Sequence, residues 1–344
     1  MRAAPYSMLE RWLHWLALEP TAVRELSFDL ERQHSRERVR AGAAGAVHIC
    51  GLARSGTTVL LRALARSPAF RTLTYRDMPF VLAPRLWQRV SSRMARSIPA
   101  GERAHGDGIL VDLDSPEAFE EVFWRTFCAQ SPGDRGYGTA QPKAEALAAF
   151  AEYRAIVADG RRYLSKNNNN LVRLDALARD RSATLLVVYR EPVAVARSLL
   201  RQHRRFSAAQ REAPFTRAYM GWLGHHEFGL DHKPYSFALE SMDPSLAPAD
   251  PDYWIDYWDA VHREILRHEH VHLVDHDRLC QEPVAVFGAI VDLLGIDADP
   301  ALLASEIRKP SAERAAPDAF RPACLERASR THGELRASRR NVHR

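Results

Sequence analysis

Short apolar runs alternate with stretches of helical periodicity through most of the chain. The clearest run is 184–189, TLLVVY, which is apolar at nearly every position. This is the pattern of a central parallel strand buried on both faces. Weaker runs predict strands at 47–50, 70–75, 163–165 and 271–274. Because strands alternate with helices, we expect an α/β fold with a parallel sheet and right-handed crossovers.

Helices are predicted between these strands. Leu60, Leu61 and Leu64, for example, fall on one face of a helix. The pairs Ser115-Pro116 and Glu191-Pro192 are typical helix starts. Helical spacing and start signals together predict helices at 57–66, 115–127, 193–200, 253–268 and 283–294.

The pattern divides the chain into an N-terminal helical extension (1–45), an α/β core (46–300) and a basic helical tail (301–344). Within the core, residues 201–252 are polar, with scattered aromatic residues, glycines and prolines. We interpret this stretch as a lid-like insertion. Its aromatic and histidine residues are candidates for lining a ligand pocket; they are Trp222, His225, His226 and Phe228.

The composition is that of a globular protein with a sizeable core. Hydrophobic residues make up 46% and charged residues 26% of the chain, which argues against wholesale disorder. No apolar run approaches the roughly 20 residues that a membrane-spanning helix needs. Four scattered cysteines lack the CxxC spacing of zinc sites, so we expect no metal, reduced thiols and a cytoplasmic protein. They are Cys50, Cys128, Cys280 and Cys324.

The formal net charge is +5, and all but four of the 48 basic residues are arginine. The guanidinium group holds phosphate and sulfate through two parallel hydrogen bonds, so this composition favours anionic ligands. The basic residues are not concentrated enough to predict a nucleic-acid partner.

The strongest chemical signal is the loop GLARSGTT, between a predicted strand and a predicted helix. It contains Arg54, Ser55, Gly56, Thr57 and Thr58. A glycine-rich turn at a helix N-terminus exposes backbone N–H groups to an anion. The loop is similar to the P-loop pattern GxxxxGK[ST], but Thr57 stands where the lysine is expected. This difference argues against an ATPase or a kinase.

A second signal follows the central strand. Arg190 ends that strand, and Ser198 lies about two turns into the next helix. Both side chains can therefore approach one anion near the end of the strand.

Taken together and in this order, the two signals resemble the sulfotransferase superfamily, whose members use 3′-phosphoadenosine 5′-phosphosulfate (PAPS). The loop 54–58 resembles the family's 5′-phosphosulfate loop, and YREPVAVARSL resembles its 3′-phosphate element. The segment 271–296 resembles its closing strand, turn and helix. The resemblance spans about 46–296 and implies one domain with a three-layer, P-loop-like parallel sheet flanked by helices.

The resemblance also implies roles in the chemistry. Lys166 and Arg54 would stabilise the transferring group. Asn168 stands where small-molecule members carry a catalytic histidine. Other branches place a carboxylate after the second strand, and Asp77 resembles it; we therefore predict Asp77 as the base, with His105 as its rival. A base near pH 7 needs burial to raise the aspartate pKa from about 3.9.

The positions of these residues support a common site. The glycine-rich loop, Asp77, Lys166 and Arg190 each follow a predicted strand. In open α/β sheets, ligands bind at the carboxyl ends of the strands. We therefore expect these groups to meet in one crevice.

The predicted activity is metal-independent transfer of the sulfuryl group of PAPS to a hydroxyl or amine. PAP is the product that remains when PAPS has lost its sulfuryl group, and the acceptor is a small molecule or a glycan. Two alternatives remain open: a non-catalytic member that binds PAP or PAPS, and a P-loop kinase.

Overall fold

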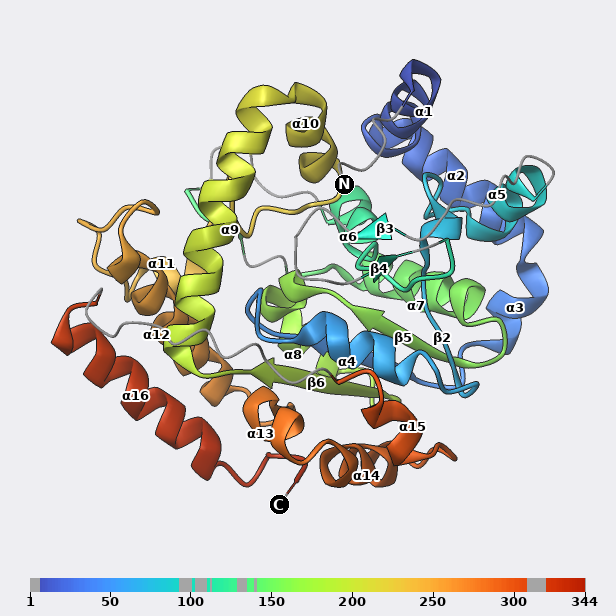
Figure 1. Cartoon of the computed structure of the whole chain (residues 1–344). Helices are drawn as coiled ribbons and strands as arrows, with labels where there is room; N and C mark the ends of the chain where they lie inside the picture. The colour runs from blue at the N-terminus through green and yellow to red at the C-terminus, as the bar shows by residue number, and fades with distance from the viewer. Residues whose placement is uncertain are drawn as a thin grey trace.

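A parallel five-stranded sheet forms the centre of the protein, in the order β2-β5-β1-β6-β7 (Figure 1). The computed structural model describes residues 7–92, 101–102, 110–111, 113–128, 135–138, 141–307 and 320–343. The strands of the sheet are β2 (Phe70–Arg71), β5 (Arg162–Lys166), β1 (Ala46–Cys50), β6 (Ala183–Tyr189) and β7 (His272–Asp275). A separate two-stranded sheet pairs β3 (Gly101–Glu102) with β4 (Leu110–Val111).

Two hydrophobic clusters cover the two faces of the sheet and make the fold three-layered. Successive strand residues point to opposite faces, and in β6 Leu186 and Val188 join one cluster while Leu185 and Val187 join the other. The predicted α/β class is thereby confirmed. The continuous apolar run of β6 reflects burial on both sides.

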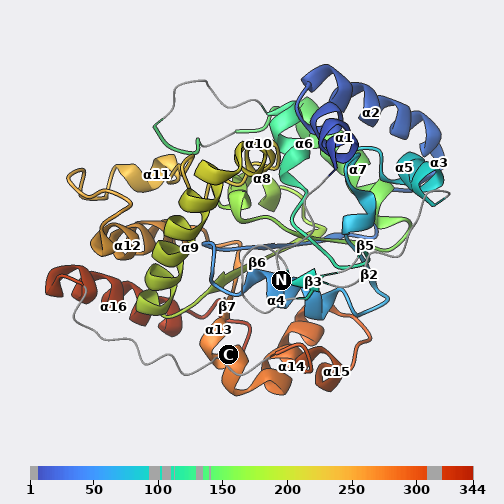
Figure 2. The same cartoon turned by 45° about the horizontal axis from the view of Figure 1, so that its top comes forward.

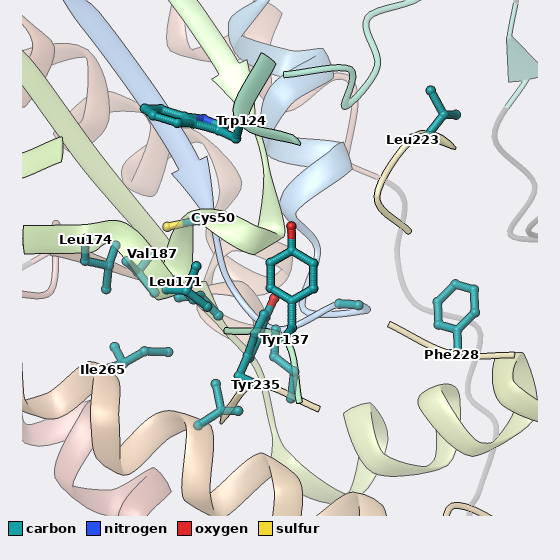
Figure 3. Packing of buried hydrophobic residues seen from close by; sticks show 14 of the residues in the cluster. Cys50, Trp124, Tyr137, Leu171, Leu174, Val187, Leu223, Phe228, Tyr235 and Ile265 are labelled. Atoms are coloured by element: carbon teal, nitrogen blue, oxygen red, sulfur yellow. The ribbon is translucent and has the colours of Figure 1, made fainter. Parts of the chain in front are cut away.

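The cluster that contains Leu186 and Val188 lies under α4 (Thr57–Leu64), α14 (Pro283–Leu294) and α15 (Pro300–Ala304). The second, larger cluster packs against helices on the other face, and Figure 3 shows part of it around Trp124 and Tyr235. The helices that contribute to it include α6 (Glu121–Phe127), α7 (Ala144–Ala158), α8 (Leu174–Ala178), α9 (Pro192–Glu212) and α12 (Pro251–Arg267).

The remaining helices surround this core. Helices α1, α2, α3 and α5 gather on one side in both views, and α16 lies along α12 (Figures 1 and 2). Their bounds are α1 (Met8–Leu18), α2 (Thr21–His34), α3 (Arg36–Ala41), α5 (Pro84–Ser91), α10 (Pro214–Trp222), α11 (Ser236–Leu239), α13 (His276–Gln281) and α16 (Pro322–Ala337). Two 3₁₀ helices are η1 (Tyr75–Asp77) and η2 (Asn168–Arg173).

Three element boundaries differ from the predictions. The strand predicted at 70–75 ends at Arg71, and the chain then turns into η1. The helix predicted from Ser115 begins only at Glu121, because Pro116 lies beside Thr74 in an antiparallel bridge. The helix predicted to end at Leu200 continues to Glu212.

Two buried carboxylates at the start of α6 tie η2 to the core. The guanidinium group of Arg173 donates two hydrogen bonds to Glu121, from Nη1 to Oε2 at 2.8 Å and from Nη2 to Oε1 at 3.0 Å. Glu120 accepts hydrogen bonds from Asn170 Nδ2 at 2.8 Å and from the Tyr163 hydroxyl at 3.0 Å. These bonds fix the chain immediately after β5.

Removing the guanidinium group should unfold the protein more readily. We expect Arg173→Met to lower the free energy of unfolding by about 3–5 kcal/mol, because the carboxylate of Glu121 stays buried without its cation. Denaturant unfolding measures this loss. Arg267→Met is the control, since the Arg267–Glu264 pair is solvent-exposed and such pairs contribute about 0–1 kcal/mol. Equal stabilities of the two variants would contradict the prediction.

Candidate functional site

The loop between β1 and α4 has a backbone that requires glycine at two positions. Gly51 has a φ of 151°, and a Cβ there would lie 2.3 Å from the Val188 carbonyl oxygen. Gly56 has a φ of 98°, and its Cβ would lie 2.0 Å from Cδ2 of His276. The loop is thus pressed between β6 and the residue that follows β7.

The loop presents groups that suit an anion. Helix α4 begins at Thr57 without a side-chain cap, so its first N–H groups and its dipole face the loop. The hydroxyl of Ser55 is buried and has no hydrogen-bond partner among the described residues. This hydroxyl has the capacity to hydrogen-bond to an anion held by the loop.

Arg54 and Ser198 meet across the sheet edge. Nε of Arg54 donates to Oγ of Ser198 at 3.0 Å, although 144 positions separate the two residues. The contact joins the glycine-rich loop to α9. The structure therefore brings together the two elements that the sequence predicts to hold one donor.

Arg190 lies at the end of β6 beside the residues that follow β7. Its Nε is 3.7 Å from Oδ1 of Asp277, while Oδ2 of Asp277 accepts the backbone N–H of Glu191 at 2.8 Å. Nε of Arg190 is buried and makes no hydrogen bond with the described residues. An acidic neighbour holds this cation at the sheet edge.

Lys166 and Asn168 flank the loop from the end of β5. Lys166 is 8% exposed and its backbone is in register with Ile49 of β1. Oδ1 of Asn168 accepts a hydrogen bond from the Thr57 hydroxyl at 3.2 Å. Thr57, at the lysine position of a P-loop, thus anchors the loop to η2.

Asp77 is buried in a small hydrogen-bonded turn. Its Oδ2 accepts from the Thr74 backbone N–H at 2.8 Å, and its Oδ1 accepts from Nε2 of Gln88 at 2.7 Å. Arg71 lies 3.9 Å away. Burial raises the pKa of Asp77, against the lowering effects of Thr74, Arg71 and Gln88. These contacts give Asp77 a capping role in η1, and its role as a base stays a prediction. The rival base, His105, lies outside the described residues.

The insertion contributes a carboxylate that the sequence pattern does not single out. Oε1 of Glu227 accepts from Nδ2 of Asn168 at 3.4 Å. Burial alone would raise the pKa of Glu227, but the charges of His225 and Lys166 hold it well below its usual range. Glu227 lies in the sequence HHEF, between the pocket candidates His226 and Phe228. This position is the one feature of the sequence that could have indicated Glu227 as a site residue.

A narrow cavity lies between the loop and the insertion. Its lining includes Leu52, Ala53, Asn169, His226 and Glu227. Tyr137 and Tyr235 also line it, and their rings lie close together in Figure 3. Of the pocket candidates, His226 contributes to the lining, whereas Trp222 and Phe228 are buried in the hydrophobic core.

Two further properties of the described residues bear on the site. Within them, no group of three or more His, Cys, Asp or Glu side chains is arranged to hold a metal ion. In the same part of the chain, no helix combines the length and hydropathy needed to cross a membrane.

The fold and the site define an α/β protein with a glycine-rich, P-loop-like loop at the carboxyl ends of a parallel sheet. The chain belongs to the sulfotransferase family, whose family model matches residues 46–300. No curated protein matches the sequence significantly.

Solved structures with similarity to this chain include three bacterial sulfotransferases. STF1 from Mycobacterium tuberculosis H37Rv is 14% identical, with 91% of this chain and 83% of that chain covered and a TM-score of 0.48. STF9 from Mycobacterium avium is 14% identical, with coverages of 98% and 85% and a TM-score of 0.46. A sulfotransferase from Alicyclobacillus acidocaldarius is 15% identical, with coverages of 85% and 94% and a TM-score of 0.35.

The close approach of His276 to Gly56 can be tested by adding one methyl group. We expect Gly56→Ala to destabilise the protein by about 2–4 kcal/mol, because left-handed strain and overpacking add together. Gly160→Ala is the matched control, since Gly160 has a φ of 81° but nothing within 4 Å of the added carbon. Urea unfolding compares the two variants.

A second substitution separates the two contributions. Adding His276→Ala to Gly56→Ala should recover the part of the loss that comes from the clash. If Gly56→Ala and Gly160→Ala were equally stable, the packing of His276 on the loop would be contradicted.

Proposed function

We propose that the protein transfers the sulfuryl group of PAPS to a hydroxyl or amine of an acceptor. The observation that carries this proposal is the 3.0 Å hydrogen bond from Arg54 to Ser198. It connects the loop expected to hold the 5′-phosphosulfate with the helix expected to hold the 3′-phosphate. Membership of the sulfotransferase family supports the same reading.

The proposed donor site uses two groups of residues. Ser55, Gly56, Thr57 and Thr58, with Arg54, would bind the 5′-phosphosulfate through hydroxyls, backbone N–H groups and one guanidinium. Arg190 and Ser198 would bind the 3′-phosphate. The buried Ser55 hydroxyl and the buried Nε of Arg190, both without a hydrogen-bond partner among the described residues, would gain acceptors in that complex.

In the proposed reaction, negative charge develops on the oxygen that bridges sulfur and the 5′-phosphate. Lys166, at the end of β5, and Arg54, in the loop, are the cations proposed to stabilise this charge. Groups that are already oriented in a dry site stabilise developing charge effectively, because they need not reorganise during the reaction. The exposure of only 8% for Lys166 is consistent with such a site.

We further propose that the chain functions as one domain with a small-molecule or glycan acceptor, in a reducing compartment such as the cytoplasm. All four cysteines are free thiols, as is usual for proteins in reducing surroundings.

The donor can be tested without knowing the acceptor. We expect PAP to raise the melting temperature and ATP with Mg²⁺ to leave it unchanged. A ligand at a hundred times its Kd adds about 2.7 kcal/mol of stability, which a thermal-shift titration resolves readily. Stabilisation by Mg-ATP alone would replace the proposal with a kinase.

Arg190 gives a sharper test of the 3′-phosphate site. We expect Arg190→Ala to weaken PAP binding about 10- to 100-fold, because a hydrogen bond to a charged group contributes roughly 1.5–3 kcal/mol. Calorimetric titration measures the affinity. Arg204→Ala removes the same charge from an exposed position on α9 and should bind PAP normally. An unchanged affinity in Arg190→Ala would remove it from the site.

A further inference from the structure

The segment that follows α10 is held firmly against the chain after β5. The Tyr235 hydroxyl donates to the backbone carbonyl of Asn168 at 2.9 Å. Nδ2 of Asn169 donates to the Gly224 carbonyl at 3.0 Å. Gly224 itself has a φ of 74°, and a Cβ there would lie 2.5 Å from Cγ of Glu121. The insertion therefore has a defined position over the carboxyl end of β5.

These contacts place the carboxylate of Glu227 inside the site. Asn168 binds Oε1 at 3.4 Å, and Nδ1 of His225 is 3.4 Å from Oε2. Oε2 is nevertheless buried and accepts no hydrogen bond from the described residues. Oε1 is thus oriented by Asn168, while Oε2 has His225 beside it and no hydrogen bond from the described residues.

The cavity beside Glu227 connects this carboxylate with the anion-binding loop. Leu52 and Ala53, the two residues before Arg54, line it together with Tyr235 and Tyr257. An acceptor hydroxyl in this space could face both the carboxylate and a donor held by the loop.

We propose that Glu227 is the catalytic base that takes the proton from the acceptor, and that this cavity receives the acceptor group. The inference rests on the proposed transfer from PAPS. In the step, the acceptor O–H bond breaks and its proton moves to Oε2 of Glu227. The acceptor oxygen forms a bond to sulfur, and the bond from sulfur to the bridging oxygen breaks. That oxygen leaves with the electron pair on PAP, and Glu227 later releases the proton to water.

The charges around Glu227 fit this cycle. Although Glu227 is buried, His225 and Lys166 lower its pKa. The carboxylate is therefore ionised before the acceptor arrives. A bound anionic donor shares the charge of Lys166 and weakens its pull on Glu227. The pKa of the carboxylate then rises, and the group becomes a better base when the donor is in place.

Asn168 positions the proposed base, Glu227, through a hydrogen bond. Its amide cannot accept a proton, but it bridges the Thr57 hydroxyl and Glu227 Oε1. Asn168 therefore holds the carboxylate of Glu227 beside the loop.

The test compares Glu227→Gln with the unsubstituted chain of 344 residues. Turnover is measured as PAP formed from PAPS, with water as the acceptor and then with added ethanol as the probe, because an aliphatic alcohol keeps its proton at neutral pH. Loss of a general base lowers the rate about 10²- to 10⁴-fold, and we expect this loss in both assays. PAP affinity, measured by calorimetry, should be at least that of the wild type, because a negative charge near Lys166 is removed.

Three further variants make the result interpretable. Glu240→Gln, at an exposed position of the same insertion, should keep full turnover. Glu227→Asp should recover part of the activity, and it serves as the second variant if Glu227→Gln does not fold. Asp77→Asn tests the base predicted from the sequence; we expect its main effect on stability, through the lost η1 contacts.

The outcomes separate the two proposals. Lack of PAP binding by the wild type would overturn the proposed donor and the inference with it. PAP binding without PAPS turnover by the wild type would make the protein a non-catalytic member and overturn the inference. Full turnover by Glu227→Gln would overturn the base assignment alone, and a selective loss of turnover in Asp77→Asn would return the role to Asp77.

Discussion

The burial of two adjacent carboxylates, Glu120 and Glu121, is the constraint on which the site depends. Burial alone would raise the pKa of Glu120, but bonding to His48, Ser165 and Asn170 holds it well below its usual range. Charges removed from water are tolerated only when hydrogen bonds and opposite charges surround them. The partners of these carboxylates come largely from β5 and the residues just after it. The same bonds that satisfy Glu120 and Glu121 therefore fix Lys166 and Asn168.

The parallel sheet then places the candidate functional groups at one edge. The loop after β1, Lys166 at the end of β5, Arg190 after β6 and His276 after β7 all lie at carboxyl ends of strands. Each strand contributes one part, and none of these parts is close to another in the sequence. The ring of His276 leaves no room for a Cβ at Gly56, which shows how closely these strand ends are packed. Such packing orients the groups in advance, which is what transition-state stabilisation requires.

Local sequence patterns predicted the central strands and the glycine-rich loop because their signals lie within a few residues. The apolar run of β6 reflects burial on both faces, and glycine at 51 and 56 reflects backbone that no other residue adopts easily. The full length of α9 was missed because its buried stripe includes the polar side chains Gln202 and Gln210. Polarity suggested that a lid-like insertion begins at residue 201, whereas α9 continues to Glu212 and makes an extended contact with α12.

The two candidate bases, Asp77 and Glu227, show which structural information a sequence pattern does not contain. Asp77 was predicted because it follows a strand at the expected separation from the loop, yet one of its oxygens accepts from Thr74 at the start of η1 and the other from Gln88 of α5. Glu227 has no motif around it, and its proposed role rests on the hydrogen bond from Asn168 and on the charges of His225 and Lys166. A carboxylate is suited to proton transfer when one oxygen is oriented and the other is available. That distinction depends on long-range contacts, so the three-dimensional structure supplies it and the sequence alone does not.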